Sequence, residues 1–375
     1  MNRAGTSGEA ARLVVQVVPY FPPHVGGMEN VAKTIADSLA EFRTVEVLTS
    51  TSGAEAERRL ARSENLLVRR LFTVELAHVP FLPSLLFHLL RLPKDAIIHM
   101  HVAQAFVPEI VWLASALRRR PYIAHFHLDV EPSGLFGRLF VAYKKFVLGA
   151  VLRSATRVIA VSPDQPPFLR RTYGVRGERI VLIPNGVAAQ FFSAPREAGH
   201  HNRPFRLLFV GRLAPQKNVS LLLRAVALIS SPVELVIVGD GEERRMLEQL
   251  AGSLGLSNVR MLGAMVGDDL VQWYRWADAF VLTSRKESTG LVLLEAMAAG
   301  VPVIATEAEG VVDTVGDSGL LTPPEPAALA RAVERLAANP SLWTELARRG
   351  HARAAQQPWA RAVETLRDVY EEVGG

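Results

Sequence analysis

The chain has 375 residues, of which 49% are hydrophobic and 21% charged, a balance typical of a globular protein with large buried cores. This composition argues against a disordered or fibrous chain. The 42 Lys and Arg residues outnumber the 37 Asp and Glu residues, and the net charge of +5 suits phosphate groups or an anionic surface as partners. The absence of cysteine excludes disulfides, thiolate metal sites and cysteine nucleophiles.

The sequence predicts a cytoplasmic protein. Its first twelve residues, MNRAGTSGEAAR, lack the apolar core of a secretory signal, and apolar runs such as 146–152 are shorter than the roughly 18 residues of a spanning helix. Residues 135–152 predict a basic amphipathic helix, with Arg138, Lys144, Lys145 and Arg153 along it. Such a helix suits peripheral contact with anionic lipid at the inner face of the membrane, and a core-packed helix with a solvated basic edge fits the pattern at least as well.

Short β-branched runs alternate with segments of helical spacing in residues 1–194. The predicted strands are LVVQVV, VEVLTS, AIIHMH, RVIAVS and IVLIP, and residues 28–42 carry apolar side chains at helical spacing. Alternation of strands and helices is typical of βαβ units on a parallel sheet. We therefore expect an N-terminal Rossmann-like domain over residues 1–194.

A second series of strands begins at Phe205, with the runs FRLLFVG, ELVIVG, VRML, AFVLTS, VPVIAT and GLLT. The polar, Pro- and Gly-containing stretch before it predicts a linker at 195–205 and a second Rossmann-like domain at 206–355. The expected fold class is thus α/β, with two facing domains, parallel sheets and an interdomain cleft. Ligands of such sheets bind beyond the carboxyl ends of the strands.

Two glutamates in the second half are the most informative candidates. Glu287 and Glu295 have seven residues between them, the first in a polar loop and the second inside a helix that begins near Gly290. At ~1.5 Å per helical residue they lie on the order of 10 Å apart, which suits two ends of one extended ligand. The free amides at the helix start, those of Gly290, Leu291 and Val292, form an anion site with the helix dipole. Either glutamate alone would be taken as a solvated side chain, but the combination favours a site.

Two basic residues lie in the loop VGRLAPQKNVS, after the first strand of the second half. Arg212 offers a planar fork and Lys217 a point charge, a combination suited to neutralising a diphosphate leaving group. Two solvated loop cations would give the same local pattern. Their position at the carboxyl end of a strand favours a functional interpretation.

Glycine-rich loops follow two of the predicted strands. Gly26 and Gly27 precede a helix, where missing side chains would let backbone amides approach a phosphate, although a plain turn would look the same. The run Gly239-Asp240-Gly241 resembles a truncated dinucleotide fingerprint, but Arg244 stands at the third glycine. We therefore give an oxidoreductase little weight.

Histidines gather at the ends of two strands, as His99 with His101 and as His125 with His127, and Asp129 follows. A His-x-His-x-Asp set could hold a metal, but its three ligands would have to converge from one extended run. We favour His127 as a cleft residue that offers one hydrogen bond. The sequence has no Asp-x-Asp pair, so we expect no metal. We expect no cofactor either.

With AMAAGVPVIAT behind Glu295, the sequence resembles the retaining glycosyltransferases of family 4, which share the two-domain GT-B fold. The resemblance covers nearly the whole chain and follows the family's order. It runs through PPHVGGMENVAKTIADSLAE, DAIIHMH, PYIAHFHLD, RVIAVS, IPNGV, VGRLAPQKNVSLLLRAV, VIVGDGEERRMLEQLAGSLGL, the glutamate pair and SGLL. The resemblance implies that the first domain lies on the acceptor side and that the second binds the nucleotide sugar. In this family a C-terminal helix, here within 356–375, crosses back onto the first domain.

The resemblance implies roles for particular residues. Glu287 would hold hydroxyls of the donor sugar, Glu295 the ribose, and Arg212 with Lys217 the diphosphate. Gly27 would line the phosphate site from the opposite domain, and His127 would lie beside the sugar and acceptor. The implied catalytic set is Glu287, His127, Arg212 and Lys217. Two departures are Thr289, where the family often has Phe, and Val312-Asp313, where it usually has Pro-Glu.

We therefore expect a retaining, metal-independent glycosyltransferase that moves a hexose-like sugar from a nucleotide-diphosphate donor to a hydroxyl of a small-molecule, lipid or glycan acceptor. A secondary-metabolite scaffold, an envelope lipid and a polysaccharide end all stay open as acceptors. No nucleic-acid partner is expected, and no motif specifies the base, the sugar or the oligomeric state. The alternatives are a nucleotide-sugar 2-epimerase, which needs no acceptor, and a non-catalytic nucleotide-sugar sensor.

Overall fold

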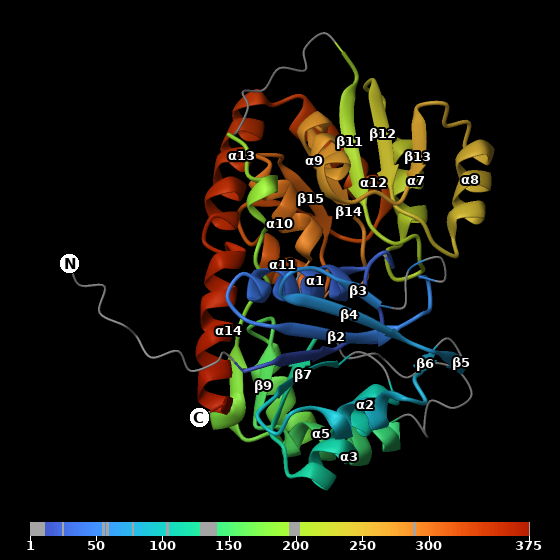
Figure 1. Cartoon of the computed structure of the whole chain (residues 1–375). Coiled ribbons are helices and arrows are strands. Elements are labelled where there is room, and N and C mark those ends of the chain that lie inside the picture. Colours follow the sequence, from blue (N-terminus) through green and yellow to red (C-terminus); the bar gives the residue numbers. More distant parts are fainter. Residues whose placement is uncertain are drawn as a thin grey trace. The chain divides into compact units, whose positions relative to one another are not determined.

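The computed structural model describes residues 12–24, 26–54, 57, 60–76, 79–102, 105–127, 141–194, 203–287 and 290–374 (Figure 1). The chain divides into two compact units, Met1–Pro184 with Val363–Gly375, and Asn185–Ala362. This division falls ahead of the expected linker at 195–205, of which only 203–205 are described. No helix in these described ranges is long and apolar enough to cross a membrane.

An eight-stranded sheet forms the centre of the first unit, in the order β10-β9-β8-β7-β1-β2-β4-β3. All of its pairings are parallel except that of β3 with β4. Its strands are β1 (Val14–Val17), β2 (Val45–Ser50), β3 (Leu60–Arg62), β4 (Leu66–Leu71), β7 (Ile97–Val102), β8 (Tyr122–Phe126), β9 (Arg157–Ala160) and β10 (Ile180–Leu182). A separate antiparallel pair joins β5 (Val74–Leu76) and β6 (Val79–Phe81).

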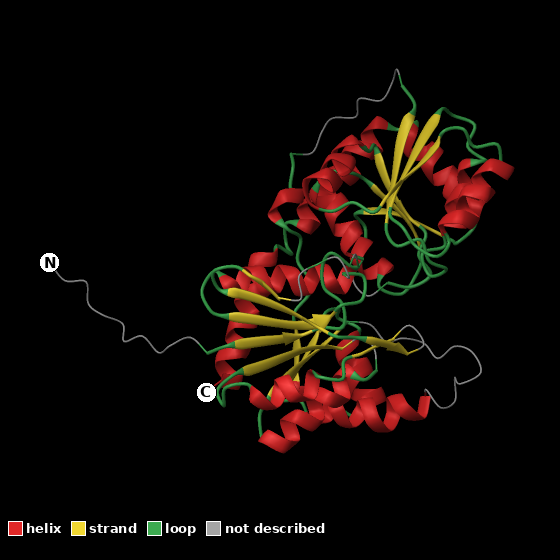
Figure 2. Cartoon of the chain, turned by 45° about the vertical axis from the view of Figure 1, so that its right-hand side comes forward, coloured by secondary structure: helices red, strands yellow, loops and turns green. Residues whose placement is uncertain are grey.

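Helices cover both faces of this sheet (Figures 1 and 2), with α1 on one face and α2, α3 and α5 on the other. Helix α1 buries Val31, Ile35 and Leu39, at the spacing predicted from the sequence. The helical elements are α1 (Gly27–Ala40), α2 (Leu85–Arg91), α3 (Val107–Arg118), the π-helix η1 (Lys144–Leu148), α5 (Gly149–Ser154), α6 (Gln165–Phe168), the π-helix η2 (Leu169–Tyr173), the 3₁₀ turn η3 (Gly177–Arg179) and the later part of α14 (Trp359–Gly374).

Alternation along the central strands separates apolar from polar side chains. Val15 and Val17 of β1 join the hydrophobic cluster that includes residues of α2, α3 and α5. Gln16, between them, points to the opposite face and is fully buried there. The face of the sheet beneath α1 thus carries buried polar groups.

A six-stranded, wholly parallel sheet forms the centre of the second unit, in the order β13-β12-β11-β14-β15-β16. Its strands are β11 (Phe205–Val210), β12 (Val233–Val238), β13 (Val259–Gly263), β14 (Ala279–Leu282), β15 (Val303–Thr306) and β16 (Gly319–Thr322). Its helical elements are η4 (Ala189–Phe191), α7 (Val219–Val226), α8 (Arg244–Ser253), α9 (Gly267–Trp276), α10 (Leu291–Ala298), α11 (Val311–Val315), α12 (Pro326–Ala337), α13 (Pro340–Ala354) and the first residues of α14.

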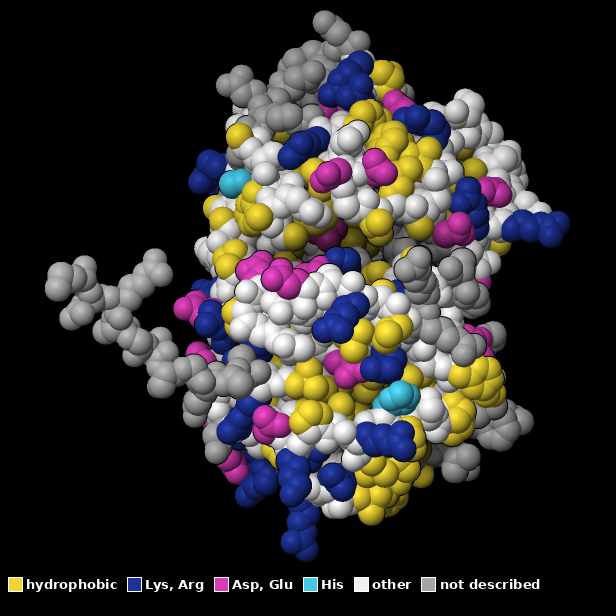
Figure 3. All heavy atoms as spheres, in the orientation of Figure 1, with side chains coloured by type: hydrophobic (Ala, Val, Ile, Leu, Met, Phe, Trp, Pro, Cys, Tyr) yellow, Lys and Arg dark blue, Asp and Glu magenta, His cyan; other side chains and the backbone are white. Residues whose placement is uncertain are grey.

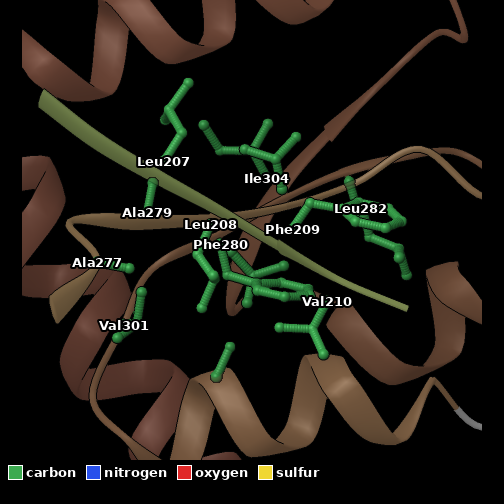
Figure 4. Close-up of a cluster of buried hydrophobic side chains, with 14 of the residues drawn as sticks. Leu207, Leu208, Phe209, Val210, Ala277, Ala279, Phe280, Leu282, Val301 and Ile304 are labelled. Atoms are coloured by element: carbon green, nitrogen blue, oxygen red, sulfur yellow. The ribbon is translucent and has the colours of Figure 1, made fainter. Parts of the chain in front are cut away.

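The core of the second unit extends on both sides of this sheet. Figure 4 shows Leu208 of β11 beside Phe280 of β14, its register partner, with Leu207 on the other side of the strand. All three side chains are fully buried. Burial on both faces explains why these strands are continuous apolar runs rather than alternating ones.

Each predicted strand run forms a strand, but the short strands β3, β5 and β6 were not predicted, nor was the six-residue β4. Its sequence, LLVRRL, contains two arginines that weaken the apolar signal. Both find partners in the fold: Arg69 pairs with Glu46 at 2.7 Å, and Arg70 donates to the carbonyl of Pro22 at 2.7 Å. The predicted basic helix is described only from residue 141, where it continues into η1 and α5.

Candidate functional site

A largely buried ion pair joins two loops of the second unit. Lys217 follows β11 and Glu287 follows β14, and these strands are neighbours in the sheet. Lys217 Nζ lies 2.5 Å from Glu287 Oε1, which also accepts a hydrogen bond of 2.5 Å from Ser284 Oγ. The Lys217 and Glu287 side chains are 19% and 10% exposed. The pair therefore lies at the carboxyl ends of parallel strands, where ligands of such sheets bind.

Hydrogen bonds hold the two loops together. The Thr283 hydroxyl donates to the carbonyl of Lys217 at 3.0 Å, and the Arg285 amide donates to the carbonyl of Gln216 at 2.8 Å. The Gln216 side chain donates in turn to the carbonyl of Lys286 at 2.7 Å. This backbone support positions the ion pair before any ligand arrives, as a preorganised site requires.

Gly290 begins α10 in the left-handed region, with φ 51° and ψ 51°. The left-handed conformation favours glycine because it strains any residue that has a Cβ. A Cβ at this position would also come within 2.7 Å of Leu293 Cδ1. The amide of Leu293 makes the first bond of the helix, to the carbonyl of Gly290 at 2.8 Å. The amides of Leu291 and Val292 precede that bond and make no hydrogen bond among the described residues, so they can donate to an anion. Thr289 lies outside the described residues.

Glu295 lies within α10 and is held by Tyr274 of α9, a residue that sequence reasoning missed. Tyr274 is fully buried, and its hydroxyl donates to Glu295 Oε2 at 2.7 Å. Burial raises the pKa of Glu295 to about 7, and the hydrogen bond from Tyr274 acts in the opposite direction. A buried tyrosine usually hydrogen bonds through its hydroxyl, but its partner is not readable from the sequence.

Arg212 is placed differently from Lys217. It is 64% exposed, and its guanidinium pairs with Glu242 at 3.2 Å. The loop before Glu242 packs tightly on the loop that carries Arg212, since a Cβ on Gly239 would lie 1.9 Å from the carbonyl oxygen of Gly211. Close loop packing therefore accounts for Gly239, without any dinucleotide.

At the start of α1, Gly26 and Gly27 have different surroundings. A Cβ on Gly26 would lie 2.2 Å from Glu29 Oε2, whereas one on Gly27 would meet nothing within 4 Å. Glu29 is 6% exposed, and its other oxygen lies 2.9 Å from His24 Nδ1. An anion at Gly26 would face this carboxylate, while Gly27 offers open space to a ligand.

His127 belongs to a stack of buried histidines from β7, β8 and the residue after β8. The others are His99, His101 and His125, and the ring centroids of contacting members lie 4.4 to 5.2 Å apart. Burial lowers the pKa of His99 and of His127 to about 3 and that of the other two well below the ordinary value. All four imidazoles are therefore neutral at pH 7.

The described residues contain a three-histidine group, His99, His101 and His125, whose ring nitrogens lie within 4.8 Å of one another. It differs from the set considered from sequence, of which Asp129 lies outside the described residues. Both nitrogens of His99 and both of His101 already make hydrogen bonds. A metal ion at this group would have to displace those bonds.

The second unit thus brings Lys217, Glu287 and the start of α10 to one edge of a parallel sheet. The sequence matches the family model Glycosyltransferase Family 4 over residues 25–191 and the model Glycosyl transferases group 1 over residues 191–356.

Two relatives illustrate the similarity in sequence. The chain is 30% identical to the alpha-D-kanosaminyltransferase of Streptomyces kanamyceticus over 310 residues, which are 76% of this chain and 79% of that protein. It is 35% identical to the D-inositol 3-phosphate glycosyltransferase of Streptomyces bingchenggensis over 245 residues, which are 59% of this chain and 54% of that protein. The chain thus spans about half the length of the inositol-phosphate enzymes it matches.

Solved structures share the fold. Anabaena Alr3699/HepE in complex with UDP and glucose matches with a TM-score of 0.78 and 23% identity, over 96% of this chain and 100% of that one. Sucrose-phosphate synthase from Thermosynechococcus elongatus matches with a TM-score of 0.75 and 23% identity, over 96% and 99%. The chain has the GT-B fold of two Rossmann-like domains, and it belongs to glycosyltransferase family 4.

Proposed function

We propose that this protein is a retaining glycosyltransferase that moves a sugar from a nucleotide-diphosphate donor to a hydroxyl of an acceptor. The observation that carries the proposal is the Lys217–Glu287 pair beside the start of α10, at the carboxyl edge of the second sheet. The cation and the helix amides suit the diphosphate and the negative charge that grows on it as it leaves, and the carboxylate suits hydroxyls of the sugar.

In the proposed reaction the bond between the anomeric carbon and the diphosphate oxygen breaks, and that carbon bonds to the acceptor oxygen, whose proton is released. Negative charge grows on the diphosphate as the bond breaks. Lys217 and the amides of Leu291 and Val292 would stabilise that charge without a metal ion. Glu287, once its ion pair with Lys217 opens toward the ligand, would accept hydrogen bonds from hydroxyls of the sugar.

The remaining candidates have supporting roles in the proposal. Glu295, oriented by Tyr274, would accept hydrogen bonds from the ribose, and Arg212 would reach the diphosphate after leaving Glu242. Gly27, with open space around it, would admit a phosphate to the start of α1. His127 would contact the donor sugar and the acceptor.

UDP-glucose is the first donor to test, because the Anabaena neighbour was solved in complex with it. The name of the bacterial relatives makes D-inositol 3-phosphate one acceptor to include. A panel of nucleotide sugars should be screened by thermal shift, since a donor present at a hundred times its Kd stabilises by ~2.7 kcal/mol. Donors that bind should then be tested for transfer, with the anomeric configuration of the product read by NMR.

Four outcomes separate the alternatives. A product with the same anomeric configuration as the donor supports the proposal, and an inverted product contradicts it. Conversion of the donor without any acceptor would identify a 2-epimerase. Tight donor binding with neither transfer nor hydrolysis across the acceptor panel would identify a sensor.

We also propose that the first unit contacts anionic membrane lipid. Figure 3 shows hydrophobic side chains gathered over α2 and α3, with Lys and Arg side chains beside them. Phe87 of α2, Leu117 of α3 and Phe146 of η1 are 49%, 61% and 66% exposed. Arg91 lies over the ring of Phe87, and Lys145 lies near that of Phe146. Exposed apolar side chains with basic neighbours suit an anionic bilayer surface.

Co-sedimentation with phosphatidylcholine vesicles, with and without phosphatidylglycerol, tests this contact. Binding that requires phosphatidylglycerol and weakens in Phe146→Ser supports it. Leu228→Ser is the matched control, because Leu228 is also an exposed apolar residue, at 55%, but belongs to the second unit. Equal behaviour of the two variants, or no binding by the wild type, would exclude this surface.

A further inference from the structure

A chain of hydrogen bonds runs through the first unit from Gln16 to His127. His101 Nε2 lies 3.2 Å from the side-chain amide of Gln16, and His101 Nδ1 lies 2.8 Å from His127 Nε2. Gln16 and His101 are fully buried, and His127 is 7% exposed. Each link needs one donor and one acceptor, and the neutral imidazole of His101 carries a single proton, so the direction of the first bond determines that of the second.

The environment of Gln16 determines the direction of the first bond. One end of its amide faces His101 Nε2 and the carbonyl of Ala32, which lies at 3.1 Å and can only accept a hydrogen bond. The backbone amide of Ala36 lies 3.2 Å from the other end. Because a carbonyl only accepts and a backbone amide only donates, the Gln16 nitrogen must point toward Ala32 and its oxygen toward Ala36. The same nitrogen then faces His101 Nε2. Gln16 therefore donates to His101 Nε2.

The proton positions follow step by step. Because His101 accepts at Nε2 and is neutral, its proton is on Nδ1, and it donates to His127 Nε2. His127 accepts at Nε2, so its own proton is on Nδ1. We propose that Gln16 and His101 are positioning residues that hold His127 in the Nδ1-protonated form, so that it presents a hydrogen-bond donor to the substrate.

The consequence for the reaction rests on the proposed function. Within the described part of the chain, Nδ1 of His127 has no hydrogen-bond partner, so this N–H is available to a ligand. A neutral imidazole that donates from Nδ1 can hold a hydroxyl oxygen of the sugar or acceptor, but it has no lone pair there with which to remove a proton. His127 thus orients substrate and does not act as a general base.

The second hydrogen-bonded chain in the same stack provides a matched control. There His125 Nδ1 contacts His99 Nε2 at 3.1 Å, and His99 Nδ1 contacts the Tyr370 hydroxyl at 2.5 Å. Tyr370→Phe removes a buried hydrogen bond from the stack without touching the link to His127. Gln16→Met keeps the length of the side chain and removes the donor to His101.

Nitrogen NMR of histidine-labelled protein tests the proton positions directly, with the His127 signals identified by their loss in His127→Gln. We expect the wild type to show a protonated Nδ1 and an unprotonated Nε2. Gln16→Met should shift these signals toward the opposite tautomer, whereas Tyr370→Phe should leave them unchanged. A wild-type His127 protonated at Nε2 would overturn the proposal, and so would a Gln16→Met variant with unchanged signals. The wild-type measurement stands even if Gln16→Met does not fold.

Kinetics test the role of this tautomer. Gln16→Met should lower turnover about tenfold, the loss expected for one misdirected hydrogen bond, while Tyr370→Phe should not. A profile of turnover against pH should show no ionisation of His127 between pH 5 and pH 8. If Gln16→Met alters the NMR signals of His127 but leaves turnover unchanged, the tautomer of His127 has no role in the reaction. If the wild type transfers no sugar at all, the proposed function fails, but the NMR result still decides the proton positions.

Discussion

Replacing Glu295 by Gln should change how the stability of the protein depends on pH. Burial raises the folded-state pKa of Glu295 from 4.5 to about 7, so the folded protein favours the protonated carboxyl. The sign follows from linkage. This group stabilises the fold fully below about pH 4.5, and that contribution is lost as the pH rises to about 7. Gln is a neutral mimic of the protonated form and has no such loss.

The size of the effect follows from the pKa. A change from 4.5 to about 7 corresponds to ~3 kcal/mol in the free energy of unfolding. Glu295 keeps some exposed surface, and access of water reduces this penalty, so we expect about 2 kcal/mol. Near pH 4 the variant and the wild type should differ little. At pH 8 Glu295→Gln should be more stable than the wild type by that amount.

Urea unfolding between pH 4 and pH 9, followed by tryptophan fluorescence, measures this difference. Trp273, Trp276, Trp343 and Trp359, four of the five tryptophans, lie in the second unit, so the signal reports mainly on the unit that contains Glu295. Tyr274→Phe is the companion variant. It removes the hydrogen bond that lowers the folded-state pKa of Glu295, so the pH at which the loss of stability is complete should move upward.

Donor binding should change in the same pH range, because hydroxyl donors of a ribose stabilise the ionised carboxylate. Wild-type affinity for the donor should therefore rise from pH 6 to pH 8, and Glu295→Gln should lose this dependence. A stability difference between wild type and Glu295→Gln that does not vary with pH would refute the argument, since the carboxylate would then not be penalised by burial.

Three further outcomes are expected. Lys217→Ala should slow transfer by raising the activation free energy by ~3 kcal/mol, and Arg212→Ala should slow it as well. Lys286→Ala, at a neighbouring loop position, is the control and should have little effect. Near wild-type turnover in Lys217→Ala and Arg212→Ala would remove both residues from the mechanism. Glu287→Gln should depress turnover, whereas Glu295→Gln should mainly weaken donor binding, and kinetics with varied donor at saturating acceptor would distinguish the two losses. Activity should survive thorough chelation, and a complete loss that added metal reverses would instead point to the histidine group as a metal site.

The local features of this protein were predictable from its sequence. The apolar runs at 205–211 and 279–284 predict buried parallel strands because burial on both faces leaves no polar alternation. The helix between Gly290 and Gly300 was predicted from its end signals, and α10 lies there. The resemblance also placed Lys217 and Glu287 in one site, and the structure joins them as an ion pair. Their roles toward a ligand, and the interdomain cleft, stay predictions.

The partners of these side chains depended on the tertiary structure. Tyr274 lies 21 residues before Glu295, and Gln16 lies 85 residues before His101, so no local pattern connects them. The sequence shows that His99, His101, His125 and His127 alternate on two strands. The register of β7 against β8, which pairs His101 with His125, brings them into one stack. Register and burial arise from hydrogen bonds and packing between distant segments, and they set both the proton positions in the stack and the pKa of Glu295.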